Sequence, residues 1–418
     1  MSAAVEAMET ADAPLDVAAV RAQFPALSQE INGKPLVYLD SGASAQKPQA
    51  VIDAMDRFYA HDYSNVHRGV HALSQRATEA FEAARATMAR FVNAPDERGV
   101  LFTRGTTEGI NLVAQAWGRA NLGAGDEVVL SEMEHHSGIV PWQLVCEATG
   151  ATLVVLRMDD RGVIPDAEIS DKIGPRTKMV SVTHIANALG TVNPIRRIVE
   201  HAHDHGALVL VDGAQAAPHV AIDVQALGCD FYAFSGHKMY GPTGIGVLWG
   251  RFELLAAMPP WHGGGDMIKR VTFEKTTYAE PPARFEAGTP DIAGAVGMAA
   301  AAEWLMDLGL DRVAAWDREV LEYGHAALAE IPGLRMIGTA PDKTGILSFV
   351  IDGVHPHDLG TLLDMDGVAV RVGHHCAQPV MDRFGVSATT RASLGVYNTR
   401  EDIDRLAAAI RKALSLLG

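Results

Sequence analysis

Short apolar segments that alternate with helical segments constrain the fold of this chain more than any other feature. Apolar runs of strand length stand at residues 100–103, 126–130, 152–157, 178–183, 207–211 and 230–234. Several of the segments between them have helical spacing, as in residues 72–92 and 194–205. Strands joined by helices form a mostly parallel sheet with helices on both faces, so the sequence predicts an α/β fold.

The pattern changes after Pro332 and Gly333. Short strands are expected at residues 345–351 and 368–372, and helices at residues 357–364 and 400–417, which indicates a smaller α+β domain. We expect a large domain over residues 41–300 and a small domain that combines residues 21–40 with residues 301–418. Residues 1–20 are predicted to form a flexible N-terminal tail.

Composition narrows the range of partners. The formal net charge is −16 and no run of Lys and Arg stands out, which argues against nucleic acid or an anionic membrane as the main partner. No uninterrupted apolar run reaches the roughly 18 residues needed to span a bilayer. The three cysteines lack the spacing of zinc sites or disulfides, so a reducing cytoplasm is the expected location.

Polar side chains follow the ends of several predicted strands. Ligands of parallel α/β sheets bind beyond the carboxyl ends of the strands. Ser235, His237 and Lys238 follow the strand at 230–234, and Asp212 follows the strand at 207–211. Further strand-end candidates are His135, Asn187 and Gln215. A lysine beside a glycine is usually a solvated loop residue, so Lys238 gains meaning only from these neighbours.

The segment Gly105–Thr106–Thr107 joins a predicted strand to a predicted helix. Free backbone N–H groups and two hydroxyls at a helix N-terminus can bind an anion. Threonine also caps helices without any ligand, and the segment matches no Walker or dinucleotide-binding motif. Both interpretations therefore stay open at this point.

A second polar group lies in the predicted small domain. Cys376 stands in the loop Arg371–Ala377, which contains Gly and two His residues, and Arg391 follows 15 residues after the cysteine. Cys146 and Cys229 are interpreted as small buried apolar residues. Consecutive His-His-Cys residues seldom bind one ion, so we predict no metal site.

Taken together, these residues match the needs of a pyridoxal 5'-phosphate (PLP) enzyme. Lys238 would carry the cofactor as a Schiff base, and Asp212 would keep its ring nitrogen protonated so that the ring acts as an electron sink. Thr107, Ser235 and His237 would bind the phosphate.

The chain resembles the cysteine desulfurases of the class V aminotransferase family, which are fold-type I PLP enzymes, and specifically the group II (SUF-type) members. The matching motifs are VYLDSGASAQKP (37–48), NVHRGVH (65–71), RGTTEGINLVA (104–114), EMEHH (132–136), VDGAQ (211–215), FSGHKMYGPTGIG (234–246), RFEAGTP (284–290), RVGHHCA (371–377) and TRASLGVYNT (390–399). The resemblance implies a seven-stranded sheet in the large domain.

The resemblance also implies roles for single residues. His135 is similar to a catalytic histidine that stacks on the cofactor ring, and Gln215 to the residue that bonds the phenolic oxygen. Thr289 is similar to a threonine that reaches the phosphate of a partner subunit, so a homodimer is implied. The implied cofactor-binding set further includes Thr106, and the implied substrate-binding set is Asn187, Arg371 and Arg391.

The implied reaction converts L-cysteine to L-alanine and leaves the sulfur as a persulfide on Cys376. An acceptor protein of the SUF system would then take the sulfur for iron–sulfur cluster assembly. The alternatives are a selenocysteine lyase on the same scaffold and, with less support, another PLP-dependent aminotransferase or lyase. A non-catalytic scaffold is disfavoured because Lys238 and Asp212 are both present.

Overall fold

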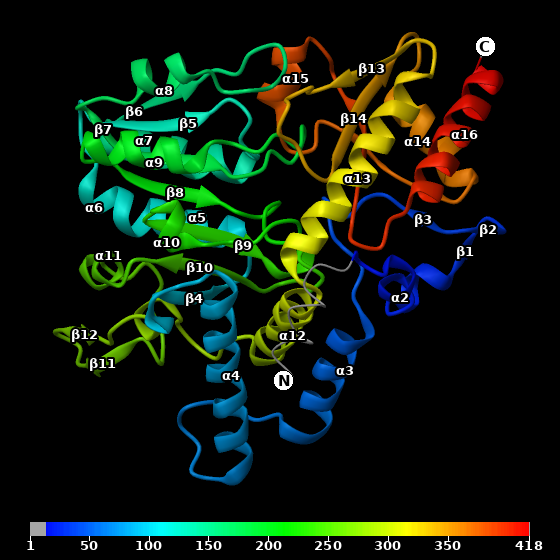
Figure 1. Cartoon of the computed structure of the whole chain (residues 1–418). Coiled ribbons are helices and arrows are strands. Elements are labelled where there is room, and N and C mark those ends of the chain that lie inside the picture. Colours follow the sequence, from blue (N-terminus) through cyan, green and yellow to red (C-terminus); the bar gives the residue numbers. More distant parts are fainter. Residues whose placement is uncertain (1–13, 418) are drawn as a thin grey trace, which may run out of the picture.

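A seven-stranded sheet forms the centre of the computed structural model, which describes residues 14–417 (Figure 1). Its strand order is β4-β10-β9-β8-β7-β5-β6. The strands are β4 (Val100–Thr103), β5 (Glu127–Ser131), β6 (Thr152–Leu156), β7 (Thr177–Thr183), β8 (Leu208–Asp212), β9 (Phe231–Ser235) and β10 (Gly246–Gly250). Only β10 runs antiparallel to its neighbours β4 and β9, which confirms the predicted, mostly parallel seven-stranded sheet.

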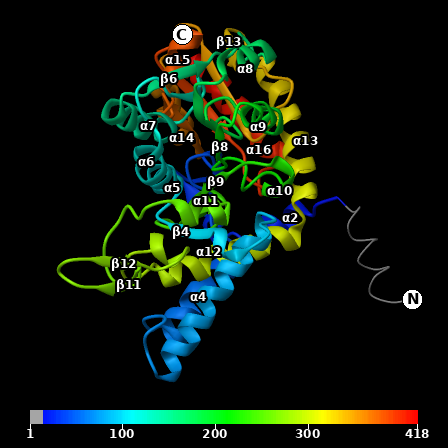
Figure 2. The same cartoon turned by 90° about the vertical axis from the view of Figure 1, so that its left-hand side faces the viewer.

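Helices cover both faces of this sheet. The helices of the large domain are α3 (Gln49–Arg57), α4 (Ala72–Phe91), α5 (Thr106–Leu112), α6 (Arg119–Asn121), α7 (His136–Thr149), α8 (Asp166–Lys172), α9 (Ile195–Asp204), α10 (Val224–Leu227), α11 (Phe252–Ala257) and α12 (Ile292–Leu308). The hairpin β11 (Ile268–Val271) and β12 (Thr276–Tyr278) and part of α4 lie at the end of the molecule away from the C-terminal elements (Figures 1 and 2).

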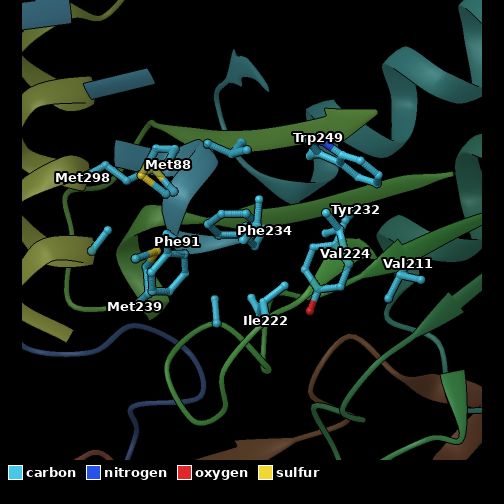
Figure 3. Packing of buried hydrophobic residues seen from close by; sticks show 14 of the residues in the cluster. Met88, Phe91, Val211, Ile222, Val224, Tyr232, Phe234, Met239, Trp249 and Met298 are labelled. Atoms are coloured by element: carbon cyan, nitrogen blue, oxygen red, sulfur yellow. The ribbon is translucent and has the colours of Figure 1, made fainter. Parts of the chain in front are cut away.

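Alternating strand residues build a separate apolar core on each face, because successive strand side chains point to opposite sides. Val211, Tyr232 and Phe234 face one core, where they meet Met88 of α4 and Met298 of α12 (Figure 3). The intervening strand residues face the second core, under α5 and α7. The two cores fix the sheet rigidly, and its carboxyl edge can therefore hold side chains in defined positions.

The small domain is built on a four-stranded antiparallel sheet with the order β13-β14-β17-β16. Its strands are β13 (Leu334–Ile337), β14 (Ile346–Ile351), β16 (Arg371–Gly373) and β17 (Thr389–Ser393). The helices of this part are α2 (Val17–Arg21), α13 (Leu310–Ala329), α14 (Pro356–Met365), α15 (Gln378–Phe384) and α16 (Arg400–Leu417). Two further strand pairs are β1 (Glu30–Ile31) with β2 (Lys34–Pro35), and β3 (Val37–Tyr38) with β15 (Val368–Ala369).

Three boundaries differ from the sequence prediction. The predicted tail is wrong in its last part, because Val17 and Val20 of α2 are buried; residues 1–13 lie outside the described residues. The predicted domain boundary at residue 300 falls inside α12, whereas the chain bends by 77° between α12 and α13, and we propose Gly309 as the boundary instead. The strand predicted at 368–372 is two strands, β15 and β16, which pair with different partners.

Within residues 14–417, no single helix has the length and apolar character to cross a membrane. The pair α12 and α13 passes that test only when both helices are taken together, and it is sharply bent.

Candidate active site

A cavity of about 170 Å³ lies where the carboxyl edge of the large sheet faces the small domain. It brings together almost all of the predicted site residues, namely Thr106, Thr107, His135, Asn187, Asp212, Gln215, Ser235, His237, Lys238, Arg371, Cys376 and Arg391. Thr289 does not line it. This residue lies in a separate hollow with Arg104, Glu108 and His262.

Lys238 and Asp212 are the charged pair of the cavity floor. Lys238 ends the short 3-10 helix Gly236–Lys238 directly after β9, and Asp212 is the last residue of β8. Burial lowers the pKa of Lys238 to about 8, although Asp212 acts in the opposite direction. Burial raises the pKa of Asp212, and this effect is opposed by Lys238 and by the N–H of Ala214, which donates to Oδ1 at 2.9 Å. The charge of each group therefore offsets part of the pKa shift that burial causes in the other.

His135 is held as a neutral ring at the N-terminus of α7. Burial, followed by the positive charge of Lys238, lowers its pKa to about 3. Its Nδ1 accepts the backbone N–H of Ser137 at 3.1 Å, which places the ring proton on Nε2. A neutral, fixed imidazole presents a flat face to the cavity, as stacking on an aromatic ligand requires.

The loop between β4 and α5 forms one wall of the cavity. Ser235 Oγ accepts the backbone N–H of Thr106 at 2.9 Å and lies 2.8 Å from its hydroxyl. Gly105 has a φ of 142°, and a Cβ placed there would lie 3.0 Å from Ser235 Oγ. Only glycine lets the backbone approach so closely, and the start of α5 lines the cavity through Thr106 and Thr107.

Arg391 is the buried cation opposite the sheet edge. Its Nη1 donates to the carbonyl of Asn187 at 2.9 Å and its Nη2 to Asp40 Oδ1 at 3.3 Å. Burial lowers the pKa of Arg391 to about 10, which leaves the guanidinium charged at neutral pH. Arg371 lies opposite Arg391 in the β16–β17 register, and both line the cavity. Two guanidinium groups in one small cavity favour an anionic ligand.

Several buried polar atoms at the cavity have no hydrogen-bond partner within the described chain. They are Gln215 Oε1, Asn187 Oδ1, His375 Nδ1 and Arg391 Nε. Buried polar atoms are normally paired, so unpaired atoms of this number in one cavity indicate a site shaped for polar ligands.

Cys376 lies on a short loop at the cavity mouth. Both His375 and Cys376 adopt positive φ values, 52° and 55°. The carbonyl of Cys376 accepts the N–H of His136 at 2.7 Å, and its own N–H donates to His374 Nδ1 at 3.1 Å. Cys146 and Cys229 are buried, as predicted, and Cys376 is half-buried.

Three residues of the site were missed by sequence reasoning. Asp40, which pairs with Arg391, lies two residues after the end of β3. Glu134 is buried beside Thr183, and burial raises the pKa of its carboxyl to about 8. His136 touches the Cys376 loop. Glu134 and His136 act through contacts between distant segments, which a single sequence does not display.

Comparison with known proteins agrees with this geometry. The aminotransferase class-V family model matches residues 37–406, and the chain belongs to this family. Its relatives include the cysteine desulfurase of Synechococcus elongatus, 53% identical over 95% of this chain, and that of Dickeya dadantii, 52% identical over 96% of this chain. The structure of the Escherichia coli cysteine desulfurase CsdA in its S-sulfonic acid form is 45% identical, with a TM-score of 0.89 over 96% of this chain and 99% of that one.

The relatives differ in length. The chain spans 63% of the Synechococcus protein and 97% of the Dickeya protein.

Proposed function

We propose that this chain is a PLP-dependent cysteine desulfurase of the group II (SUF) type. The observation that carries the proposal is the meeting of Lys238, Asp212 and Cys376 in one cavity, although the cysteine stands 138 residues beyond the lysine and on another domain. Family membership and the names of the relatives support it.

The residues of the cavity fit PLP. Lys238 would hold it covalently, Asp212 would pair with the ring nitrogen, and His135 would cover one face of the ring. The N-terminus of α5, with Thr106, Thr107, Ser235 and His237, would bind the phosphate. Gln215 Nε2 donates one N–H to the carbonyl of Gly42 at 2.8 Å, and its second N–H would reach the ring oxygen. When bound, the cofactor supplies an electron sink for bonds broken at the amino-acid substrate.

The chain's own residues would then orient the substrate. Arg391, whose Nε is a buried donor without a partner in the described chain, would bind the substrate carboxylate, with Arg371 nearby. Asn187 Nδ2 donates one N–H to the carbonyl of His375 at 2.7 Å and would offer its second N–H to the same carboxylate. Lys238 Nζ, with its pKa lowered to about 8, would take up and return the proton at the substrate Cα near neutral pH.

Cys376 would carry out the sulfur transfer. Its Sγ, as the thiolate, attacks the substrate sulfur; the bond between carbon and sulfur breaks, and its electron pair stays with the carbon side, which is released as alanine after protonation. The transferred sulfur remains on Cys376 as a persulfide. An acceptor protein of the SUF system would remove this sulfur. The protein would act in the cytoplasm as a homodimer, in which Thr289 would contact the cofactor phosphate bound by the partner subunit.

The test measures alanine and sulfide released from L-cysteine in the presence of a thiol reductant. The unchanged protein should release both in equal amounts, and the Lys238→Ala and Cys376→Ala variants should release neither above background. Selenocysteine, compared under the same conditions, tests the lyase alternative. Retained turnover in Cys376→Ala with L-cysteine would show that the thiol is incidental and would sink the proposal.

A further inference from the structure

We infer that His136 is a positioning residue that fixes Cys376 for attack by accepting a hydrogen bond from the loop that carries this cysteine. The inference deepens the proposed function and rests on it for the role of Cys376. His136 is the first residue of α7, next to the cofactor-facing His135, so it connects the two chemical centres of the cavity.

Two hydrogen bonds join His136 to the backbone that directly follows the Cα of Cys376. Its backbone N–H donates to the carbonyl of Cys376 at 2.7 Å, and its side-chain Nε2 accepts the backbone N–H of Gln378 at 3.2 Å. The first bond holds the cysteine's own peptide unit, and the second holds the start of α15 two residues later. The chain is thus tied at two points directly after the Cα of Cys376 to one helix of the large domain.

The loop needs such support because of its backbone conformation. His375 and Cys376 have φ values of 52° and 55°, in the left-handed region that residues other than glycine seldom adopt. A strained conformation of this kind persists only where its surroundings hold it in place. His374 adds one local contact, since its Nδ1 accepts the N–H of Cys376, and its ring centroid lies 5.5 Å from that of His136.

The bond to Gln378 requires a particular protonation state. Because Nε2 accepts a hydrogen bond from a backbone N–H, it carries no proton, and the proton of the neutral ring is on Nδ1. The titratable groups that face His136 are His135 beside it on α7, and His374 and Cys376 on the opposite loop. Burial, followed by His374, lowers the pKa of His136 from its ordinary value of 6.5, so the acceptor is present at neutral pH. Protonation in acid would turn Nε2 into a donor and release Gln378.

The alternative is that the imidazole only fills space beside His374. Three substitutions separate the two roles. Gln places an acceptor oxygen near the position of Nε2 but does not titrate. Asn is polar but too short to reach Gln378, and Ala removes the group altogether. His136→Gln should therefore behave like the parent, and His136→Asn like His136→Ala.

The experiment measures the rate at which iodoacetamide alkylates Cys376 in the full-length, cofactor-loaded protein, by mass spectrometry of the Cys376 peptide. Loss of one hydrogen bond should raise the rate about fivefold to tenfold in His136→Ala and His136→Asn, and His136→Gln should stay within about twofold of the parent. Gln143→Ala, exposed on the same helix, is the control and should leave the rate unchanged. Cofactor absorbance and thermal melting verify that each variant is folded.

A second readout is the pH profile. The ratio of the alkylation rate of the parent to that of His136→Gln should rise as the pH falls below the ordinary histidine pKa of 6.5, because only the parent loses its acceptor. An unchanged rate in folded His136→Asn, or equal rates in His136→Gln and His136→Ala, would overturn the inference. Alkylation needs no turnover, so a parent without desulfurase activity would count against the proposed function alone.

Discussion

Of the charged residues that line the cavity, Asp212 and Arg391 are buried and Lys238 is half-buried. Burial lowers the pKa of Lys238 and Arg391 and raises that of Asp212. Lys238 and Asp212 offset part of each other's shift, and Asp40 offsets part of the shift of Arg391. This mutual dependence means that each residue sets the protonation of its neighbours. Burial in a charged cavity of this kind favours a lysine that takes up and releases a proton near neutral pH.

The uptake of PLP should depend on pH through Lys238. An amine attacks an aldehyde only when it is neutral, and a lowered pKa of about 8 means that the neutral form grows as the pH rises through that value. Protein freed of cofactor should therefore take up PLP faster with rising pH, with a midpoint near this pKa, as followed by absorbance. In Asp212→Asn the midpoint should move to lower pH, because Asp212 raises the lysine pKa. A midpoint that moves upward, or stays in place, would contradict this account.

Residue identities at the site were largely predictable because they follow strand ends. Asp212, Ser235 and Lys238 lie where a parallel sheet collects ligands, and the structure places them there. The approach of Cys376 and Arg391 from the small domain depends on packing between domains. The motif resemblance, rather than any local pattern, anticipated that contact.

Among the elements, the β4–α5 connection does the most to shape the cavity. Gly105 takes a φ of 142° and passes close to Ser235, and Gly246 of β10 lies close to Gly105 in turn. The backbones of β10 and of the β4–α5 connection are therefore packed so closely at Gly246 and Gly105 that neither position has room for a side chain. The sequence predicted the strand, the turn and the helix, but left open whether the helix start binds an anion or is merely capped.

Gly105→Ala should weaken PLP binding at least about tenfold, because the added methyl group would crowd Ser235 and strain the backbone by about 1–3 kcal/mol. Pyridoxal without its phosphate should lose much less affinity. The matched control is Gly125→Ala, which also has a positive φ, 94°, but has open space around it. The affinities are measured by titrating both variants with PLP and with pyridoxal and recording the absorbance. Equal losses for PLP and pyridoxal would refute a role in phosphate binding.

At the scale of the whole molecule, the site exists only where the two domains meet. Bonds such as Arg391 to the carbonyl of Asn187 cross this boundary, and so does the pair of His219 with Asp317 of α13. The side chains of that pair are 3% and 1% exposed, so it is a buried polar link between the domains. Its partners are 98 residues apart in the chain. Strand and helix patterns do not indicate contacts at such separation, which is why the sequence did not predict the pair.

Removing one partner of the buried pair should destabilise the protein. Asp317→Ala leaves His219 without its partner in a buried position, which should lower the free energy of unfolding by about 3 kcal/mol. Glu319, on the same helix as Asp317, forms an exposed pair with Arg400 of α16, and Glu319→Ala should cost less than about 1 kcal/mol. Chemical denaturation of both variants measures the difference. Comparable small losses in the two variants would show that the buried pair contributes little.

The central claim is that the thiol of Cys376 takes the sulfur from an amino acid bound at Lys238. Mass spectrometry of the Cys376 peptide, after incubation with L-cysteine labelled with heavy sulfur and blocking of free thiols, tests it most directly. The account predicts one labelled sulfur atom on Cys376, none on Cys146 or Cys229, and none on Cys376 in Lys238→Ala. Label that is absent from Cys376 in the active protein, or present there without Lys238, would contradict it.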